Sequence, residues 1–375
     1  YEGRIADKGR SWCVLFDRSG KMHTLDLGAV TKFKRISPRF APHSFNTLRT
    51  DLLGEFGKGY EVATSRHYLV CAPAGRADDY VKVFEETWRR FHMYFAVRGF
   101  EMGEPEFPLI AVIFKDQRSF AEYARNENAG IGSGILGYYW STHNRVIMFE
   151  DPNMHASAPG RHLSHNQQPV SDIFAGFGEA APASREQLVL HSDPWDWAFS
   201  DPGDLAARSG INADLKETMI HEATHQLGYN TKLHNRTGRN PKWVVEGLAT
   251  VFEAPGMEKD RMGRSGKRAN QGWLHGFRKF VAGSRPDGFL EKYIRDDRTF
   301  ESDISNAYAQ AWALSFWLIE TRPREYAGFL KKMADPEVSK GLTATRRVKL
   351  FQEAFGDNLR MLDVEMLRWY ERLGD

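Results

Sequence analysis

The stretch Ile220-His221-Glu222-Ala223-Thr224-His225 places two histidines four residues apart, with a glutamate directly after the first. On an α-helix, positions i and i+4 lie on one face, so both imidazole rings can reach the same metal ion. Glu222 then lies beside the metal and can hydrogen-bond a water molecule there without being a ligand itself. The stretch therefore predicts His221 and His225 as metal ligands and Glu222 as a catalytic base.

The flanking residues favour the helix that this arrangement needs. Asp214 is a good N-cap, and Glu217 completes a capping-box pattern three residues later. Apolar residues recur at helical spacing as far as Leu227, and Gly228 is placed to end the helix. The alternative is a solvated amphipathic helix with two incidental histidines, so the rest of the sequence has to decide.

A second segment offers a third ligand. Asn240 as N-cap and Pro241 at the first helical position begin a helix that Pro255-Gly256 ends. Glu246 lies in a largely apolar turn of this helix, where a carboxylate is costly unless it is paired or bound to a metal. Two histidines and one glutamate leave the fourth position of a tetrahedral zinc open, as catalytic sites require. We therefore expect one Zn²⁺ per chain, bound by His221, His225 and Glu246.

The two segments resemble those of known enzymes. HExxH followed after about twenty residues by W-x-x-E-G-x-A resembles the gluzincin group of zinc metallopeptidases. More closely, His221–Leu227 together with Trp243–Ala249 is similar to the DUF1570 family of peptidase-MA-like bacterial proteins. Further similar stretches bring the resemblance to about residues 45 to 370; they are Arg66–Val70, Gly137–Trp140 and Tyr308–Trp312.

This resemblance implies a zinc-dependent metallopeptidase. The sequence contains nothing similar to the exopeptidase signature that recognises a free amino terminus, which favours an endopeptidase. Zinc would polarise the substrate carbonyl and activate a water molecule, while Glu222 takes the proton of that water and passes it to the leaving amine. Gluzincins commonly place a Tyr or His beside the oxyanion, and here Tyr308 at the start of an expected helix Tyr308–Ile319 is the candidate. The alternative for Tyr308 is a packing role, and Tyr229 and His234 are weaker candidates.

Other residues are expected to support this site. Thr250 and Glu253 lie one and two turns beyond Glu246 on nearly the same helix face, where they can orient the histidines; an exposed carboxylate is the alternative for Glu253. The resemblance also implies that an expected strand at Gly134–Trp140 is an edge along which an extended peptide pairs. The substrate-binding residues would then be Tyr138, Tyr139 and Trp140.

Two other interpretations compete with this one. The metzincin pattern HExxHxxGxxH fits Gly228, but Thr231 stands at its third-ligand position and His234 comes three residues late, so Glu246 is preferred. In function, the rivals are a zinc-binding module of the same fold whose cleft is plugged by residues 151–210, and a hydrolase of non-peptide amides. The presence of Glu222 argues against lost chemistry, but it does not argue against a plugged cleft.

The whole chain reads as an α+β protein. Residues 1–36 predict a small SH3-like β module with strands at Cys13–Asp17, Met22–Leu27 and Val30–Ile36. Residues 37–58 predict a linker and a helix at Phe45–Phe56. Residues 59–150 predict a mixed sheet with helices on it, with strands that include Glu61–Cys71 and Arg145–Phe149. Residues 211–375 predict a helical subdomain with the zinc site. The stretch 151–210 is rich in Pro, Ser, His, Asp and Gly and predicts an irregular insertion. By resemblance, the sheet and helical subdomains form a zincin-like catalytic domain with a cleft between them.

Composition limits the partners. The hydrophobic and charged shares of 41% and 27% are those of an ordinary globular protein, and a net charge of +2 predicts no nucleic-acid binding. No apolar run approaches the roughly 18 residues that a membrane span needs. The family resemblance implies a peptide or protein substrate as the partner. The first residue is Tyr1 rather than Met, and with the family resemblance this suggests a secreted or periplasmic protein. A bridge between Cys13 and Cys71 stays open.

Overall fold

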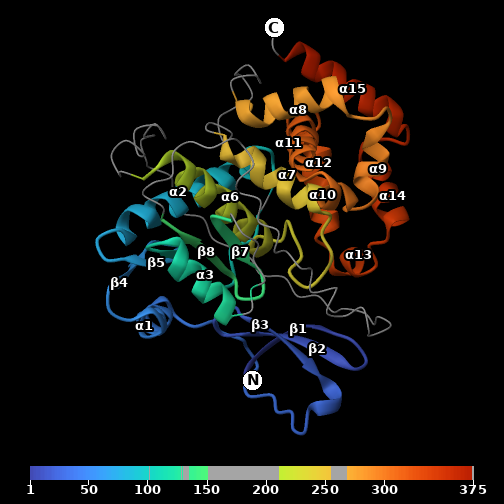
Figure 1. The fold of residues 1–375 in the computed structure, drawn as a ribbon. Coiled ribbons are helices and arrows are strands. Elements are labelled where there is room, and N and C mark those ends of the chain that lie inside the picture. Colours follow the sequence, from blue (N-terminus) through green and yellow to red (C-terminus); the bar gives the residue numbers. More distant parts are fainter. Residues whose placement is uncertain (101, 128, 130–134, 151–210, 255–267, 374–375) are drawn as a thin grey trace.

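The computed structural model describes residues 1–100, 102–127, 129, 135–150, 211–254 and 268–373, so the predicted insertion at 151–210 lies outside it. Within the described residues, the α+β prediction is confirmed: a small antiparallel sheet and a larger mixed sheet are combined with many helices. Figure 1 shows the small sheet at the N-terminal end, the mixed sheet with its helices beside it, and a helical region that contains the C-terminus.

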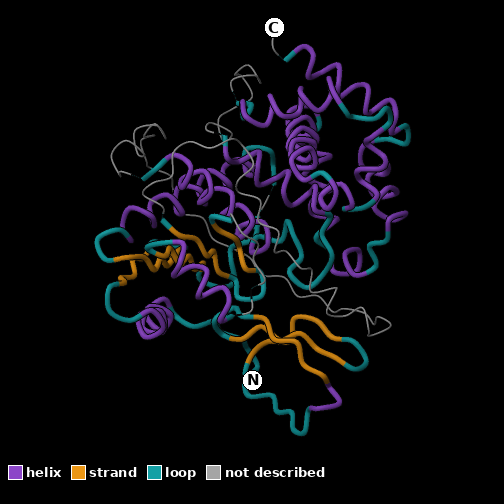
Figure 2. Tube along the Cα trace, in the orientation of Figure 1, coloured by secondary structure: helices purple, strands orange, loops and turns teal. Residues whose placement is uncertain are grey.

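The N-terminal module is a three-stranded antiparallel sheet in the order β1-β2-β3. Its elements are β1 (Gly3–Lys8), β2 (Trp12–Asp17), β3 (Met22–Asp26) and the short 3-10 helix η1 (Leu27–Ala29). The predicted strand at Val30–Ile36 is wrong, because this segment is a loop (Figure 2). Every residue from 30 to 39 is exposed, so no buried face holds the segment against the sheet.

A buried arginine fixes this module to the rest of the protein. The guanidinium of Arg236 donates hydrogen bonds to the carbonyl oxygens of Gly20 (2.8 Å) and Ser141 (2.6 Å), and it lies over the ring of Phe16. The amide of Met22 donates to the carbonyl oxygen of Thr142 at 2.7 Å. The module is therefore anchored at the turn that follows strand β7 (Gly137–Trp140) of the larger sheet.

The larger sheet has five strands in the order β4-β5-β6-β8-β7. The strands are β4 (Tyr60–Thr64), β5 (Tyr68–Pro73), β6 (Leu109–Phe114), β7 (Gly137–Trp140) and β8 (Arg145–Phe149). Strands β5, β6 and β8 are parallel neighbours, whereas β4 and β7 pair antiparallel at the two edges. A single strand was predicted over 61–71, but Glu85 accepts hydrogen bonds from the Ser65 hydroxyl and the His67 amide and so stabilises a turn between β4 and β5.

Alternating side chains of the sheet enter two separate cores. Val70, Ala111 and Met148 share one core with the helices α2 (Ala77–Ala96) and α6 (Ala213–Asn230). Cys71, Val112 and Ile147 face the other core, with α1 (Phe45–Phe56) and α3 (Gln117–Asn126). The predicted helix at Phe45–Phe56 is confirmed. Cys13 and Cys71 are free thiols buried in different sheets, so they form no bridge.

The remaining helices form the C-terminal region, in which α11 packs against α7 and α8. Their bounds are α7 (Lys242–Glu253), α8 (Gln271–Gly283), α9 (Phe289–Arg295), α10 (Arg298–Ser302), α11 (Ile304–Thr321), α12 (Pro323–Met333), α13 (Pro336–Lys340), α14 (Ala344–Phe355) and α15 (Leu359–Arg372). Among the described residues, no helix has the length and apolar character needed to cross a membrane.

Gly247 allows α7 and α11 to pack closely. A Cβ atom at this position would overlap Ser315 Oγ and lie 2.5 Å from the carbonyl oxygen of Ala311. Since Glu246 is the preceding residue, this close contact also sets the position of the predicted third ligand. The two helices would have to move apart to accept any larger residue.

We predict that Gly247→Ala lowers the free energy of unfolding by about 1–3 kcal/mol, because the added methyl group overpacks the α7–α11 contact. Gly328→Ala is the matched control, because Gly328 lies within α12 and a Cβ atom there would meet nothing within 4 Å. Alanine at this site should be neutral or stabilise by about 0.5–1 kcal/mol through helix propensity. Urea denaturation of both variants measures the difference, and equal effects would contradict the packing argument.

Candidate metal centre

Helix α6 carries the HExxH stretch and differs from its prediction at both ends. Its N-cap is Asn212, whose side chain accepts a hydrogen bond from the amide of Asp214, so Asp214 lies in the first turn instead. The helix continues past Gly228 to Asn230. A Cβ atom at Gly228 would lie 2.5 Å from His234 Cδ2, so the glycine permits a close approach of that ring rather than ending the helix.

Helix α7 brings the third predicted ligand across α6. Pro241 is its N-cap, one residue later than expected, because the side chain of Asn240 hydrogen-bonds the backbone of Asn235 instead. The Nε2 atoms of His221 and His225 are 3.0 Å apart, and each lies 3.4 Å from Glu246 Oε2. All three residues are buried. Within the described part of the chain, they are the only group of three or more His, Cys, Asp and Glu side chains with metal-binding spacing.

This donor set fits a tetrahedral zinc ion. Ligand atoms at about 2.0–2.1 Å from a tetrahedral metal lie about 3.3–3.4 Å from one another, close to the three observed separations. Glu246 Oε2 is buried and makes no hydrogen bond with any described residue. A buried carboxylate oxygen without a hydrogen-bond partner is costly, and a cation at this position would remove that cost.

The two histidines and Glu246 influence one another's protonation. Burial by itself would raise the pKa of Glu246, but the adjacent His225 and His221 outweigh it and lower that pKa. Burial would lower the pKa of His221, yet the adjacent Glu246 carboxylate and the hydrogen bond to Glu253 raise it well above the usual value. The lowered pKa of Glu246 and the raised pKa of His221 both mean that positive charge on the histidines stabilises the ionised carboxylate. A metal ion bound here would supply that positive charge in place of a proton.

Glu222 lies against the edge of the large sheet. Its Oε2 accepts a hydrogen bond of 2.6 Å from the amide of Tyr139, whereas its Oε1 has no partner among the described residues. The residue is fully buried, and burial raises the pKa of Glu222, although the two histidines oppose this. One carboxylate oxygen is thus held in place and the other is available.

Glu253 lies behind His221 and links it to α8. Its Oε1 accepts from His221 Nδ1 at 2.7 Å, and its Oε2 accepts from Trp273 Nε1 at 2.6 Å and from the side chain of Asn270. Burial and the neighbouring Glu253 raise the pKa of Glu217 to about 7. The Thr250 hydroxyl donates to carbonyl oxygens of its own helix and makes no contact with the histidines.

The sequence analysis did not identify Trp273 and Asn270 as part of the site. Asn270 is recognisable as a helix N-cap, and its side chain does accept from the amides of Gly272 and Trp273. Nothing in the spacing of either residue points to Glu253, because these contacts join α7 to a different element of the fold. Their contribution depends on tertiary packing alone.

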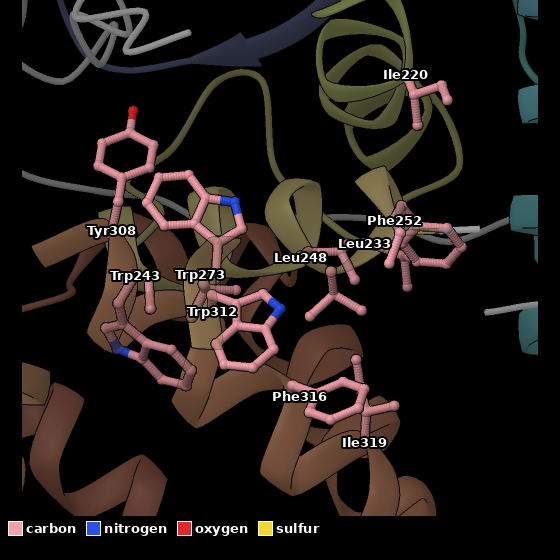
Figure 3. Packing of buried hydrophobic residues seen from close by; sticks show 14 of the residues in the cluster. Ile220, Leu233, Trp243, Leu248, Phe252, Trp273, Tyr308, Trp312, Phe316 and Ile319 are labelled. Carbon is pink, nitrogen blue, oxygen red and sulfur yellow. The ribbon is translucent and has the colours of Figure 1, made fainter. Parts of the chain in front are cut away.

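Tyr308 lies in the second turn of α11, because that helix begins at Ile304 rather than at Tyr308. Its ring stacks on Trp273 with centroids 5.9 Å apart (Figure 3). Burial and the nearby Glu246 raise the pKa of Tyr308 well above its usual value. The structure thus places Tyr308 next to the ligand group, with its hydroxyl protonated.

His234 and Tyr229 lie together beside α6. Their rings are 5.2 Å apart, and neither ring nitrogen of His234 has a hydrogen-bond partner among the described residues. Burial lowers the pKa of His234 to about 3, so this ring is neutral. Among the described groups with metal-binding spacing, His234 is absent, and Glu246 takes the third place.

The predicted substrate-binding residues occupy the edge strand β7. The ring of Tyr138 packs on Phe120, and the hydroxyl of Tyr139 donates to Asn144, so both side chains are buried in the protein body. Trp140 is half-buried and stacks on His143. Any pairing with a peptide would therefore use the strand's backbone rather than these side chains.

The whole site is closed to solvent. His221, Glu222, His225, Glu246 and Tyr308 are each at most 4% exposed. A substrate can reach the carboxylate of Glu222 only if some part of the protein moves.

We predict that Glu253→Gln weakens zinc binding by about 10- to 100-fold. Both carboxylate oxygens accept hydrogen bonds, whereas an amide offers one acceptor and turns a donor toward His221 or Trp273. Thr250→Val is the control, since the Thr250 hydroxyl contacts only its own helix, and zinc affinity should be unchanged. Competition with a chromophoric chelator measures both constants; equal affinities in the two variants would exclude this role for Glu253.

Comparisons with known proteins agree with part of the sequence analysis. No curated protein matches the chain. The similarity to DUF1570 is confirmed over residues 216–338, about a third of the chain, a stretch that includes the clustered His221, His225 and Glu246 as well as Glu253 and Tyr308. Residues 216–338 match the family model described as "Protein of unknown function (DUF1570)".

Proposed function

We propose that this protein is a zinc-dependent peptide hydrolase of the gluzincin type. The observation that carries the proposal is the position of Glu222, whose unpartnered Oε1 lies on the same helix as two members of a His-His-Glu group. A buried carboxylate with one free oxygen beside three ligand atoms is the arrangement that a general base needs. A purely structural helix gains nothing from burying these charges together.

The ligands would be His221, His225 and Glu246, which leave one coordination position open. A zinc ion bound there supplies polarisation of the substrate carbonyl and a lowered pKa of water. Glu253 holds the ring of His221 through Nδ1, which directs its Nε2 toward the other ligands.

Glu222 would move the proton. Its free Oε1 accepts a proton from the attacking water as the water oxygen bonds to the carbonyl carbon. The proton then passes to the amine nitrogen as the C–N bond breaks, so the carboxylate is regenerated. The hydrogen bond from the Tyr139 amide keeps Oε2 in place during both transfers.

Tyr308 would stabilise the oxyanion. Because its pKa is raised, the hydroxyl remains a donor at neutral pH and can hydrogen-bond a negative oxygen. Its ring is held by Trp273, which also donates to Glu253, so one tryptophan contacts both halves of the site. An extended peptide bound at the backbone of β7 would complete a zincin-like arrangement.

One observation favours a second function. Because none of the proposed site residues is more than 4% exposed, the protein could instead hold zinc as a closed structural site and act as a binding module. Zinc binding without turnover would be the result expected of that protein. The two proposals differ in what happens when Glu222 is replaced.

We predict that Glu222→Gln retains one zinc per chain and loses peptide hydrolysis by about 10²-fold or more, because the amide cannot accept the proton. Zinc content by atomic emission and cleavage of a mixed peptide library by mass spectrometry measure the two properties. Hydrolysis equal to that of wild type would exclude the proposed mechanism. Zinc without hydrolysis in the wild type itself would support the binding module.

We predict that Glu246→Ala abolishes stoichiometric zinc binding, whereas His234→Ala retains it. Glu246 contributes an oxygen 3.4 Å from both histidine nitrogens, while His234 lies outside this ligand group. Metal analysis after reconstitution and gel filtration measures the stoichiometry. Loss of zinc in His234→Ala alone would move the third ligand to His234.

A further inference from the structure

Four polar or charged residues of α6 form a ridge along one side of the helix. They are spaced by four residues, which on an α-helix places them in one row; they are Thr218, Glu222, Gln226 and Asn230. Every one of them meets the hairpin formed by β7, β8 and the turn between them. The two histidine ligands lie in the neighbouring row of the same helix.

The first two contacts bring β7 against the helix. A Cβ atom at Gly137 would lie 3.3 Å from Thr218 Cγ2 and 2.8 Å from Met148, so the absence of a side chain permits the close approach. One turn further along α6, Glu222 accepts the hydrogen bond from the amide of Tyr139. The strand edge therefore lies directly on the catalytic carboxylate.

The next two contacts secure the turn of the hairpin. Gln226 donates to the carbonyl oxygens of Asn144 (2.9 Å) and Ile110 (3.1 Å). Asn230 and Asn144 exchange two hydrogen bonds of 2.7 and 3.0 Å through their side-chain amides. Asn144 also accepts from the Tyr139 hydroxyl and has a φ of 56°, a conformation that asparagine tolerates better than most residues.

The register of β7 decides whether Glu222 has a donor. Leu136 and Trp140 direct their carbonyl oxygens toward β8 and its turn, whereas the Tyr139 amide points to the free edge. In a strand these directions alternate, so a slip by one residue would turn the Tyr139 amide away from α6. The hydrogen bond to Glu222 would then be lost, although the hairpin would still be paired.

We infer that Gln226 and Asn144 are positioning residues, which hold β7 in the register that places the Tyr139 amide on Glu222. This inference rests on the proposed function, since it concerns the orientation of the catalytic base. Neither residue touches the ligand group. They act through the hairpin, and their loss should lower turnover more than zinc affinity.

The first variant is Gln226→Met, which keeps the length of the side chain and removes both donated hydrogen bonds. Its matched control is Gln310→Met, because Gln310 is an equally buried glutamine that contacts Arg285 and Met366 in the helical region. We expect kcat to fall by about 10- to 100-fold in Gln226→Met, with zinc affinity nearly unchanged. The control should retain its kcat even where its melting temperature falls.

A second variant tests the same role independently, in case Gln226→Met does not fold. Asn144→Gly keeps the backbone conformation accessible and removes only the side-chain contacts to Asn230 and Tyr139, so a smaller loss of kcat is expected. Amide hydrogen exchange at Tyr139 should be faster in both variants than in wild type, while it is unchanged in Gln310→Met. This exchange measurement reports the hydrogen bond to Glu222 directly.

The outcomes separate this inference from the proposed function. A wild-type protein that hydrolyses no peptide would overturn both. Hydrolysis by wild type, together with unchanged kcat or unchanged Tyr139 exchange in Gln226→Met, would overturn the positioning role alone. An equal fall of kcat in Gln226→Met and Gln310→Met would also overturn it, since general destabilisation would then explain the loss.

Discussion

The spacing of residues along α6 is the constraint on which the rest of the site depends. Residues four apart form rows on a helix, and two adjoining rows of α6 carry different tasks. One row holds His221 and His225, and the other holds Glu222, Gln226 and Asn230 against the β7–β8 hairpin. Because the helix is rigid, the distance between the histidine nitrogens and the strand edge is fixed by backbone geometry. The surrounding elements then have to fit that distance.

Because several charged side chains are buried together, the neighbouring elements must supply hydrogen-bond donors or positive charge to them. Glu222, Glu246 and Glu253 are all buried close to two histidines, and each carboxylate needs donors or positive charge to offset its lost hydration. Helix α8 supplies Trp273 and Asn270 to Glu253. The edge strand supplies one amide to Glu222. Glu222 Oε1 and Glu246 Oε2 have no hydrogen-bond partner among the described residues, and both belong to the residues of the proposed chemistry.

The features that could be predicted from the sequence are those that depend on the pattern of neighbouring residues. The α+β composition, the helix Phe45–Phe56, the strand Arg145–Phe149 and the four-residue spacing of the histidines all follow from short windows. The predictions that were wrong depend on contacts between distant segments. Gly228 permits the close approach of the His234 ring and does not end the helix. The hydrogen bond from Ser65 to Glu85 stabilises a turn inside the strand that was predicted over 61–71. The contact of Trp273 with Glu253 and that of Asn144 with Asn230 could not be predicted, because each joins two elements whose relative position depends on tertiary packing.

Under the proposed function, the edge strand β7 connects Glu222 to any peptide that pairs with this strand. If a substrate pairs along β7, one of its carbonyl oxygens would accept a hydrogen bond from the outward amide of Tyr139. That amide already donates to Glu222 Oε2. Both acceptors cannot use a single N–H fully, so the peptide must either pair beyond this position or displace one carboxylate oxygen. Displacement would free Glu222 only when substrate is present, whereas pairing elsewhere would leave the base held throughout. In both cases the backbone of β7, rather than its buried tyrosine side chains, governs how substrate and base meet.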